Sequence, residues 1–508
     1  MAENFQMLIR GLGIAISPMN LFACIIGGIM GLIVGAVPGI GAVAGCSLLL
    51  PITYSINPTA AIIMLAGIYY GNMYGGAYSA ILLNIPGDSP AVITALEGHP
   101  LTKKGLAGKA LYTANYASFI GGTIGILFLT AIGAPLARIG LKFGPAETAS
   151  LIFMALTSIG WLLGDNPAKG LIATGLGVMI SNIGMDASSA NFRYTFGSTS
   201  LLSGIDFIPL VIGMFGLSQV LLLMTDNSAQ AEANKFKGKL KLRESFLKKK
   251  EMTRLLPTNI RASILGTFIG FLPGAGGTTG GFLSYMLEKK VNKNRDKMDG
   301  KQGTLEGICA SESANNAAAA GAFIPLLSFG IPGSSTTAVL LGGLLAWGLK
   351  PGPLLFQNEP DFVWGLIGSM YIGNIICLAI GMAAIPFMVK LLKIQNNILA
   401  PMIIVVCIVG AYANNNSMFD VVVMLAAGVL SYFMQKKGIG VTPLILAYVL
   451  APLFEMKVRQ ALAISNGDIT TFVTKPISLF FLLVAFTLLI APVIVKTVKK
   501  KTEKRSLA

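Results

Sequence analysis

The chain has 508 residues, of which 54% are hydrophobic and only 12% are charged, and its mean hydropathy is +0.72. Soluble domains carry about 25% charged residues, so this composition excludes an ordinary soluble protein and predicts an all-α polytopic membrane protein. The net charge of +16 does not indicate nucleic-acid binding, because the basic residues lie in short loops and near the C-terminus, as the positive-inside rule expects. The five cysteines form no CxxC pair, so neither a disulfide framework nor a zinc site is expected.

The first apolar stretch is interrupted by proline and glycine. Residues 1–19 have mixed character and fit either an interfacial helix or part of a span. The stretch from Leu21 to Leu50 is apolar apart from a break at Pro38-Gly39. A helix rises about 1.5 Å per residue and the hydrocarbon core is about 30 Å thick, so this stretch is too long for one upright helix. It predicts a re-entrant helical hairpin made of two half-spans.

A second break, Ile85-Pro86-Gly87-Asp88, interrupts the next apolar stretch, and both breaks recur later in the chain. Pro273-Gly274 follows Pro38-Gly39 by 235 residues, and Pro332-Gly333 follows Pro86-Gly87 by 246 residues. Similar offsets in the same order indicate an internal duplication. A helix in hydrocarbon is broken only where protein or water satisfies the freed backbone groups, so matching breaks in two repeats predict a transport site.

Corresponding loops of the two repeats have opposite charge bias. The loop from Pro51 to Ala60 carries no charge, whereas its counterpart from Glu288 to Lys301 carries six basic residues. After the second break the bias reverses, because the first repeat has three lysines there and the second has one lysine and two acidic residues. Cytoplasmic loops are enriched in Lys and Arg, so the pattern predicts two repeats of inverted topology. The residues of this reversal are Lys103, Lys104 and Lys109 in repeat one, and Lys350, Glu359 and Asp361 in repeat two.

The remaining apolar runs fit the same arrangement. Repeat one is predicted at 1–233, a basic cytoplasmic linker at 234–257, repeat two at 258–474, and a final span with a basic cytoplasmic tail at 475–508. Arg138 and Lys142 fall outside the cytoplasm and are the exception. The predicted crossings lie near 111–134, 148–165, 170–185, 206–224, 305–325, 362–389, 396–411, 417–434, 439–453 and 476–497.

Polar residues at the first-repeat break are candidate ligands. Asn84 and Asp88 flank Pro86-Gly87, and Ser89 and Thr94 follow. Uncoiled carbonyl groups with Asn and Asp oxygens suit a hard cation, while the free N–H groups of the next half-helix attract anions. The alternative is that Asp88 or Ser89 caps a helix that begins near Pro90, as such residues do in any protein.

The second repeat adds Glu312, Asn315 and Asn316 within an apolar stretch. A carboxylate and two amides there are costly unless they have partners or water. Glu312 is expected to bind a cation or a proton, or to pair with a lysine of the 288–301 loop, and the sequence does not separate these alternatives. The sequence also contains Tyr69, Tyr70, Tyr74 and Tyr78. Three interpretations fit these tyrosines: they line a cavity, they pack in the core, or they form an aromatic belt at the membrane interface.

The glycine-rich stretch from Gly274 to Gly280 resembles a phosphate-binding loop. No Gly-Lys-Ser/Thr follows and no strand precedes it, so ATP binding is not predicted. Close approach of the backbone to an anionic substrate explains the glycines, with bare helix packing as the alternative.

A series of motifs extends along nearly the whole chain: Tyr70–Gly76, Ile81–Gly87, Glu97–Leu101, Phe271–Gly276, Glu312–Ala318, Ile331–Ser334, Pro443–Leu446 and Ser465–Asp468. Together they resemble the TctA-type large membrane subunit of the tripartite tricarboxylate transporter family. The resemblance implies a bacterial inner-membrane secondary transporter for carboxylates, with a small TctB-type membrane subunit and a periplasmic TctC-type binding protein. It also implies that a sodium or proton gradient, and not ATP, drives transport; no cofactor is implied, and a homodimer is left open.

We therefore predict that the four Pro-Gly breaks meet near the middle of the membrane and bind substrate on half-helix N-termini. The second copy, rich in Ser and Thr, is the expected carboxylate side, and the first is the expected cation side. A channel, a carrier that needs no binding protein and a membrane-embedded enzyme are the alternatives, the last without a reactive pair of residues to support it. The predicted substrate residues are Gly39, Gly41, Ser89, Gly274, Gly276, Thr278, Thr279, Asn315, Asn316, Gly333, Ser334, Ser335 and Thr336, and the predicted cation-coupling residues are Asn84, Asp88 and Glu312.

Overall fold

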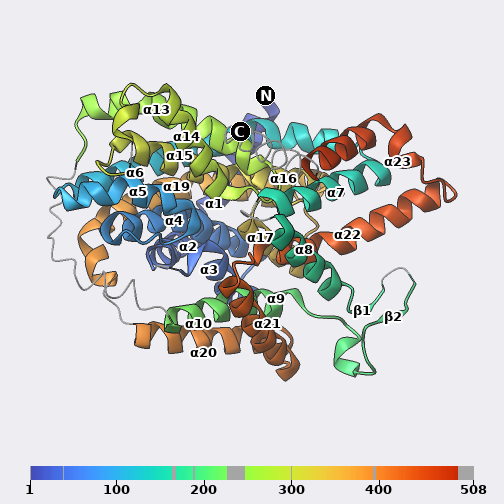
Figure 1. Cartoon of the computed structure of the whole chain (residues 1–508). Coiled ribbons are helices and arrows are strands. Elements are labelled where there is room, and N and C mark those ends of the chain that lie inside the picture. The colour runs from blue at the N-terminus through green and yellow to red at the C-terminus, as the bar shows by residue number, and fades with distance from the viewer. Residues whose placement is uncertain are drawn as a thin grey trace, which may run out of the picture. The chain divides into compact units, whose positions relative to one another are not determined.

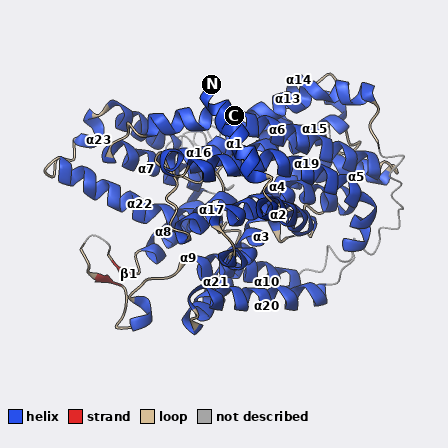
Figure 2. Ribbon diagram, turned by 180° about the vertical axis from the view of Figure 1, so that it is seen from behind, coloured by secondary structure: helices blue, strands red, loops and turns tan. Residues whose placement is uncertain are grey.

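The structure, a computed structural model, describes residues 2–37, 39–162, 167–186, 189–225, 246–298, 300–392 and 396–489. These residues are helical almost throughout, and their only strands are β1 (Gly184–Met185) and β2 (Phe192–Arg193), which form a short antiparallel pair (Figure 2). The all-α class predicted from composition is confirmed. Pro38, the first half of the predicted linker (residues 234–245) and the basic C-terminal tail lie outside the described residues.

The chain divides into two compact units. Unit 1 comprises Met1–Ala137 and Phe207–Tyr432, and unit 2 comprises Arg138–Asp206 and Phe433–Ala508 (Figure 1). The first part of unit 1 contains α1 (Ala2–Ala15), α2 (Pro18–Ala36), α3 (Gly41–Leu49), the 3-10 helix η1 (Pro51–Ser55), α4 (Pro58–Leu83), the 3-10 helix η2 (Ser89–Ala91), α5 (Val92–Lys103) and α6 (Ala107–Gly140), which runs past the unit boundary.

The second part of unit 1 contains both a duplicated hairpin and additional long helices. Its elements are α9 (Phe207–Val211), the π-helix η4 (Ile212–Leu217), α10 (Ser218–Thr225), α13 (Lys249–Phe271), α14 (Gly276–Val291), the 3-10 helix η5 (Arg295–Lys297), α15 (Leu305–Gly321), α16 (Phe323–Phe329), α17 (Ser335–Ala346), α18 (Leu355–Asn358), α19 (Pro360–Leu391), α20 (Asn396–Asn415) and α21 (Met418–Lys436). Unit 2 contains α7 (Pro145–Leu162), α8 (Pro167–Ser181), the two strands, the 3-10 helix η3 (Thr199–Leu201), α22 (Thr442–Ile464) and α23 (Thr471–Thr474).

Six helical stretches among the described residues are long and apolar enough to cross a membrane. Five of them match predicted runs, and the sixth is α2, whose 19 residues suffice for a full crossing. The first hairpin therefore pairs a full-length helix with the nine-residue α3, and not two equal half-spans. The six stretches are Pro18–Ala36, Ala107–Gly140, Phe207–Thr225, Pro360–Met388, Ile398–Asn415 and Met418–Lys436.

The run predicted at 305–325 is interrupted in the structure. Helix α15 ends at Gly321, and α16 begins at Phe323. The cause is Pro325, which has no N–H to donate to the carbonyl of Gly321 and whose ring disfavours continuation of the preceding turn. The sequence-based prediction of one continuous span was wrong here.

The closest helix pairing in the first part of unit 1 depends on glycine. A Cβ atom added to Gly31 of α2 would lie 2.4 Å from the carbonyl oxygen of Ile68 on α4. Without side chains at such positions the two backbones approach each other directly, as in small-residue interfaces between membrane helices. The same contact recurs one turn earlier and one turn later, at Gly27 against Met64 and at Gly35 against Asn72.

Helices α13 and α15 repeat this packing, and Figure 1 shows them side by side with α14. A Cβ atom on Gly266 would lie 2.3 Å from the carbonyl oxygen of Ala314, and one on Gly270 would lie 2.2 Å from that of Ala318. These positions follow their counterparts on α2 and α4 by the same 235 and 246 residues that separate the Pro-Gly breaks. The internal duplication is thus visible in packing, while the inverted orientation of the repeats stays a prediction.

Helix α13 begins at Lys249, within the predicted linker. Glu251 accepts the backbone N–H of Lys248 at 3.0 Å and pairs with Lys109 of α6, so a charged contact fixes the start of the helix. The hydrogen bond from Lys109 and then the backbone N–H hold the pKa of the Glu251 carboxyl below its ordinary value. The predicted linker therefore contributes its last residues to a helix.

Unit 2 is built on α22, which packs against α7 and α8. Beyond the predicted span at 439–453, Arg193 from strand β2 pairs with Glu455 on α22, and Arg459 pairs with both Glu455 and Asp186. The hydrogen bond from Arg193 holds the pKa of the Glu455 carboxyl below its ordinary value. Two arginines and two carboxylates thus tie the loop after α8 to α22.

The glycine packing predicts a sharp sensitivity to one methyl group. We expect Gly31→Ala to lower the free energy of unfolding by about 1–3 kcal/mol, because the added Cβ atom meets backbone that cannot move away. The measurement is the thermal unfolding midpoint of the purified protein in detergent, which should fall. The matched control is Gly175→Ala on α8, where no atom lies within 4 Å of the added Cβ. That variant should melt like the wild type or slightly higher, because alanine favours helix. Equal melting of all three proteins would show that close approach of α2 and α4 is not needed.

Candidate functional site

The two breaks of the first repeat are joined by a backbone hydrogen bond. Helix α2 ends at Ala36, and the N–H of Gly39 donates to the carbonyl oxygen of Gly87 at 3.3 Å. Gly39 and Gly41 adopt φ values of +90° and +67°, which residues with a Cβ atom rarely tolerate. The glycines of the motif thus allow the turn from α2 into α3.

The second repeat contains the same bond. The N–H of Gly274 donates to the carbonyl oxygen of Gly333 at 3.1 Å, and Gly274 and Gly276 have φ values of +78° and +57°. Four glycines that were predicted to bind substrate, Gly39, Gly41, Gly274 and Gly276, therefore form turns with positive φ. Each repeat has a tip in which one broken helix satisfies the freed backbone of the other.

Residues after the second break of each repeat cap the helices that follow. Ser334 adopts an extended backbone, and its hydroxyl accepts the N–H of Thr337 at 3.2 Å, so that it caps α17. Asp88, at the corresponding place, accepts the N–H of Ser89 at 2.7 Å at the start of η2. The capping alternative considered from the sequence for Asp88 is realised, and Ser334 has the same role in the second repeat.

Asp88 has two further donors that the sequence did not predict. Its carboxylate accepts the side-chain amide of Asn72 on α4 at 2.7 Å and the backbone N–H of Ala42, in the first turn of α3, at 3.3 Å. Three N–H groups and a helix N-terminus stabilise the ionised carboxylate. Asp88 therefore neutralises the N-terminus of α3, and its predicted role as a cation ligand stays a prediction.

The N-terminus of α14 has no such carboxylate. A Cβ atom on Gly41 would lie 3.0 Å from Oδ1 of Asp88, whereas one on the matching Gly276 would lie 3.6 Å from the Cβ atom of Ser334. The residue that precedes α14, Ala275, has no side chain that could cap the helix. The same geometry therefore ends in a carboxylate in one repeat and in a neutral hydroxyl in the other.

Contacts between the repeats bring the two tips together within unit 1. The Tyr69 hydroxyl on α4 lies 3.0 Å from the Ser334 hydroxyl. A Cβ atom on Gly277 of α14 would lie 3.3 Å from Cγ of Pro90 and 3.4 Å from the carbonyl oxygen of Asn315. The breaks from distant parts of the sequence thus converge on the start of α14.

Glu312 lies near this point in a wholly neutral polar cluster. It is fully buried, and its carboxylate contacts the hydroxyl of Thr94 on α5, the hydroxyl of Ser118 on α6 at 3.2 Å and the side-chain amide of Asn315 at 3.3 Å. The alternative of an ion pair with a lysine of the 288–301 loop does not occur among the residues that the structure describes.

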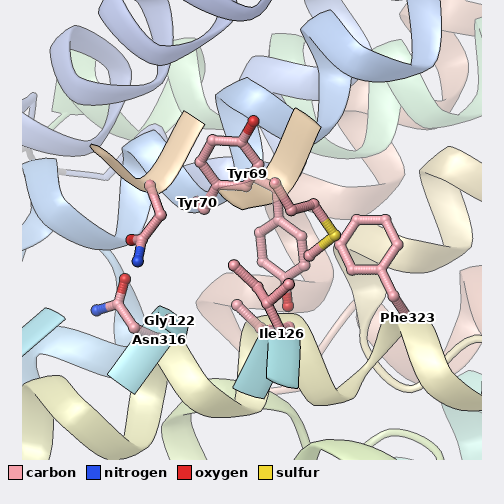
Figure 3. Close-up of a pocket in the computed structure, with 10 residues that line it drawn as sticks. Tyr69, Tyr70, Gly122, Ile126, Asn316 and Phe323 are labelled. Atoms are coloured by element: carbon pink, nitrogen blue, oxygen red, sulfur yellow. The ribbon is translucent and has the colours of Figure 1, made fainter. Parts of the chain in front are cut away.

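The other predicted residues differ in position and exposure. Asn84 ends α4 in a left-handed conformation and is exposed. Asn316 lines a small pocket with Tyr69, Tyr70 and Phe323 (Figure 3). Thr278 is exposed at the start of α14, Thr279 and Ser335 are half-buried, and Thr336 is buried.

Asn72 and Ser118 are the polar partners that sequence reasoning missed as site residues. Both are fully buried, and both lie within long, mostly apolar helices. A polar side chain in such a helix needs a partner, which was the available signal. The described residues contain no group of three His, Cys, Asp or Glu side chains that could hold a metal ion.

Comparison with known proteins gives one family and two relatives. The model of the tripartite tricarboxylate transporter TctA family matches residues 21–446. An uncharacterized 52.8 kDa protein in the TAR-I ttuC' 3' region of Agrobacterium vitis is 36% identical over 504 residues, 99% of each chain. A protein in the TAR-II ttuC' 3' region of the same organism is 40% identical over 213 residues, 42% of this chain and 87% of its own length. No solved structure matches.

The contacts of Asp88 predict a structural effect. Asp88→Asn keeps the shape of the side chain but removes the charge that three N–H groups share, and hydrogen bonds to charged groups contribute about 1.5–3 kcal/mol each. We expect a clearly lower thermal unfolding midpoint. Asp361→Asn is the control, because Asp361 is half-exposed in an ion pair with Arg10, and such pairs contribute about 0–1 kcal/mol. Wild-type stability of Asp88→Asn would refute a stabilising role of the charge of Asp88.

Proposed function

The chain belongs to the tripartite tricarboxylate transporter TctA family, and we propose that it is the large permease subunit that imports di- or tricarboxylates by symport with sodium or protons. The family makes it a component of a tripartite transporter in a membrane. The substrate class, the coupling ion and the residues that bind them are our proposal.

The observation that carries the proposal is the difference between the two matched helix N-termini. At α3 the carboxylate of Asp88 accepts a backbone N–H of the first turn. At α14 the matching residue is Ser334, whose hydroxyl caps α17, so no negatively charged side chain is described at this N-terminus. A helix N-terminus attracts carboxylates. We infer that a carboxylate of the substrate occupies at α14 the place that Asp88 occupies at α3.

The residues around this place can supply the remaining contacts. The backbone N–H groups of Gly276 and Thr278 begin α14, and glycine allows the substrate to approach the backbone closely. The hydroxyls of Ser334 and Tyr69 lie beside them and can donate to carboxylate oxygens. We propose that the predicted residues at the tips of both repeats bind the substrate. Asn315, also among the predicted residues, packs against Gly277 of α14.

Uptake of such an anion needs a coupling ion. An inside-negative potential opposes each negative charge by about 2.3 kcal/mol per 100 mV, so at least as many cations as substrate charges must accompany the import. Asn84, Asp88 and Glu312 are the proposed coupling residues. Of these, Glu312 has only neutral side-chain partners, whereas Asp88 is occupied by N–H donors.

The partners and the membrane are part of the proposal. We propose a TctB-type small membrane subunit, a periplasmic TctC-type binding protein and the bacterial inner membrane, with the C-terminus in the cytoplasm. Two contacts in unit 2 agree with the sidedness derived from charge. Lys169 donates to the carbonyl oxygen of Lys437, both on predicted cytoplasmic loops, and Arg193 pairs with Glu455, both on predicted periplasmic segments.

Reconstituted transport tests the function. Proteoliposomes that hold both membrane subunits, supplied with the binding protein, should accumulate a di- or tricarboxylate when a sodium or proton gradient is imposed and should not need ATP. Omission of the binding protein is the control and should abolish uptake. Equilibration of substrate without accumulation would indicate a channel, and uptake that requires ATP would refute the proposal.

Ser334→Asp tests the substrate site. The new carboxylate copies Asp88 and should occupy the N-terminus of α14, so we expect at least a tenfold loss of apparent affinity for the substrate, which corresponds to about 1.4 kcal/mol. Ser334→Asn is the matched control, because it has the same shape without the charge and can still cap α17. If both variants lose affinity equally, the charge is not the cause and the substrate carboxylate does not bind there.

A further inference from the structure

Glu312 is a buried carboxylate of unit 1 without a described ion-pair partner, unlike Glu288 and Glu306, which pair with Arg261 and Arg254. Glu312 lies on α15 with none of its surface exposed. Its contacts are the hydroxyls of Thr94 and Ser118 and the amide of Asn315, and Thr94 also donates to Ser311 at 3.1 Å. Thr94, Ser118, Asn315 and Ser311 are all neutral, and each is buried.

No positive charge compensates this carboxylate among the described residues. The charged side chains on the neighbouring helices whose partners are described are engaged elsewhere, and the Tyr74 hydroxyl on α4 donates to Asn374. Glu97 on α5 accepts hydrogen bonds from Tyr285 and Thr304, Lys109 on α6 pairs with Glu251, Arg261 on α13 pairs with Glu288 on α14, and Glu306 on α15 pairs with Arg254.

Burial of an ionised carboxylate without a counter-charge costs several kcal/mol, and binding of a cation removes that cost. The contacts fit a proton. Thr94, Ser118 and Asn315 already contact the carboxylate directly. A protonated carboxyl group needs no additional space, because its O–H donates to a neighbour that already lies within hydrogen-bond distance.

We propose that Glu312 is the proton-coupling group of this transporter and is protonated in the arrangement that the structure shows. The proton joins a carboxylate oxygen to form the carboxylic acid, whose O–H donates to Thr94, which in turn donates to Ser311. On release the O–H bond breaks, the electron pair stays on Glu312, and the proton passes to water. The inference rests on the proposed symport and names its ion and its site.

The position of Glu312 explains how proton and substrate are coupled. Asn315 contacts Glu312 through its amide, and its backbone packs against Gly277 at the start of α14, where the substrate carboxylate is proposed to bind. An ionised Glu312 would repel that carboxylate through a low-dielectric interior. Protonation removes the repulsion, so each ligand favours the binding of the other, as thermodynamic linkage requires.

Infrared difference spectroscopy on the purified protein tests the protonation without any transport assay. The wild type near neutral pH should show a carbonyl band of a protonated carboxyl group that disappears in Glu312→Gln. Glu306→Gln is the matched control on the same helix, because Glu306 is buried but paired with Arg254 and should be ionised. Thr94→Val keeps Glu312 and removes its hydroxyl partner, so the band should shift in frequency. A band that is unchanged in Glu312→Gln, or one that does not move in Thr94→Val, would overturn the assignment.

Transport separates this inference from the proposed function. In proteoliposomes with the binding protein and both membrane subunits, a pH gradient should drive carboxylate accumulation in the absence of sodium. Accumulation with a sodium gradient only would overturn the proton assignment and leave the symport intact. If no gradient drives uptake, the proposed function fails, and the infrared band still decides whether Glu312 carries a proton.

Discussion

The structure depends on one constraint, which is that backbone groups released where a helix breaks inside a membrane must find partners in protein. The N–H of Gly39 and the carbonyl of Gly87 are such groups, and they satisfy each other, as do those of Gly274 and Gly333. Each pair joins two breaks that lie far apart in sequence, so neither break is stable without the other. The Pro-Gly motifs therefore occur in pairs, and the duplication repeats the pair as a unit.

This arrangement requires the helices that lead into the breaks to lie unusually close together. Gly31 on α2 and Gly266 on α13 achieve this by direct backbone contact with α4 and α15. A larger residue at either position would move the tip of the hairpin away from the carbonyl that its glycine N–H needs. Helix packing and site geometry therefore depend on the same glycines. Helix packing explains part of the glycine content, and the anion-binding interpretation applies to the glycines at the breaks.

Local chemistry made the breaks, the duplication and most of the long helices predictable from sequence, because proline, glycine and apolar runs act on their own segment. The end of α15 was missed because the effect of Pro325 falls one turn earlier in the chain. The partners of Asp88 and Glu312 were not predictable, since Asn72 and Ser118 reach them only after α4 and α6 have packed. The capping role of Asp88 and the neutral surroundings of Glu312 follow from the donors that the tertiary structure brings to them, while the roles of both acids in cation coupling stay predictions.

Asp88 and Glu312 show how one unit assigns different roles to two carboxyl groups. Backbone N–H groups and a helix N-terminus surround Asp88, so its carboxylate has a structural role at the start of α3 besides its proposed role in coupling. Hydroxyls and an amide surround Glu312, and they can serve the acid and the carboxylate alike because each can donate or accept. Asp88 is thus a structural counterpart of the substrate carboxylate that we propose at α14. The exchangeable proton is proposed on Glu312, because its neighbours suit both protonation states and because its partner Asn315 packs against the first turn of α14.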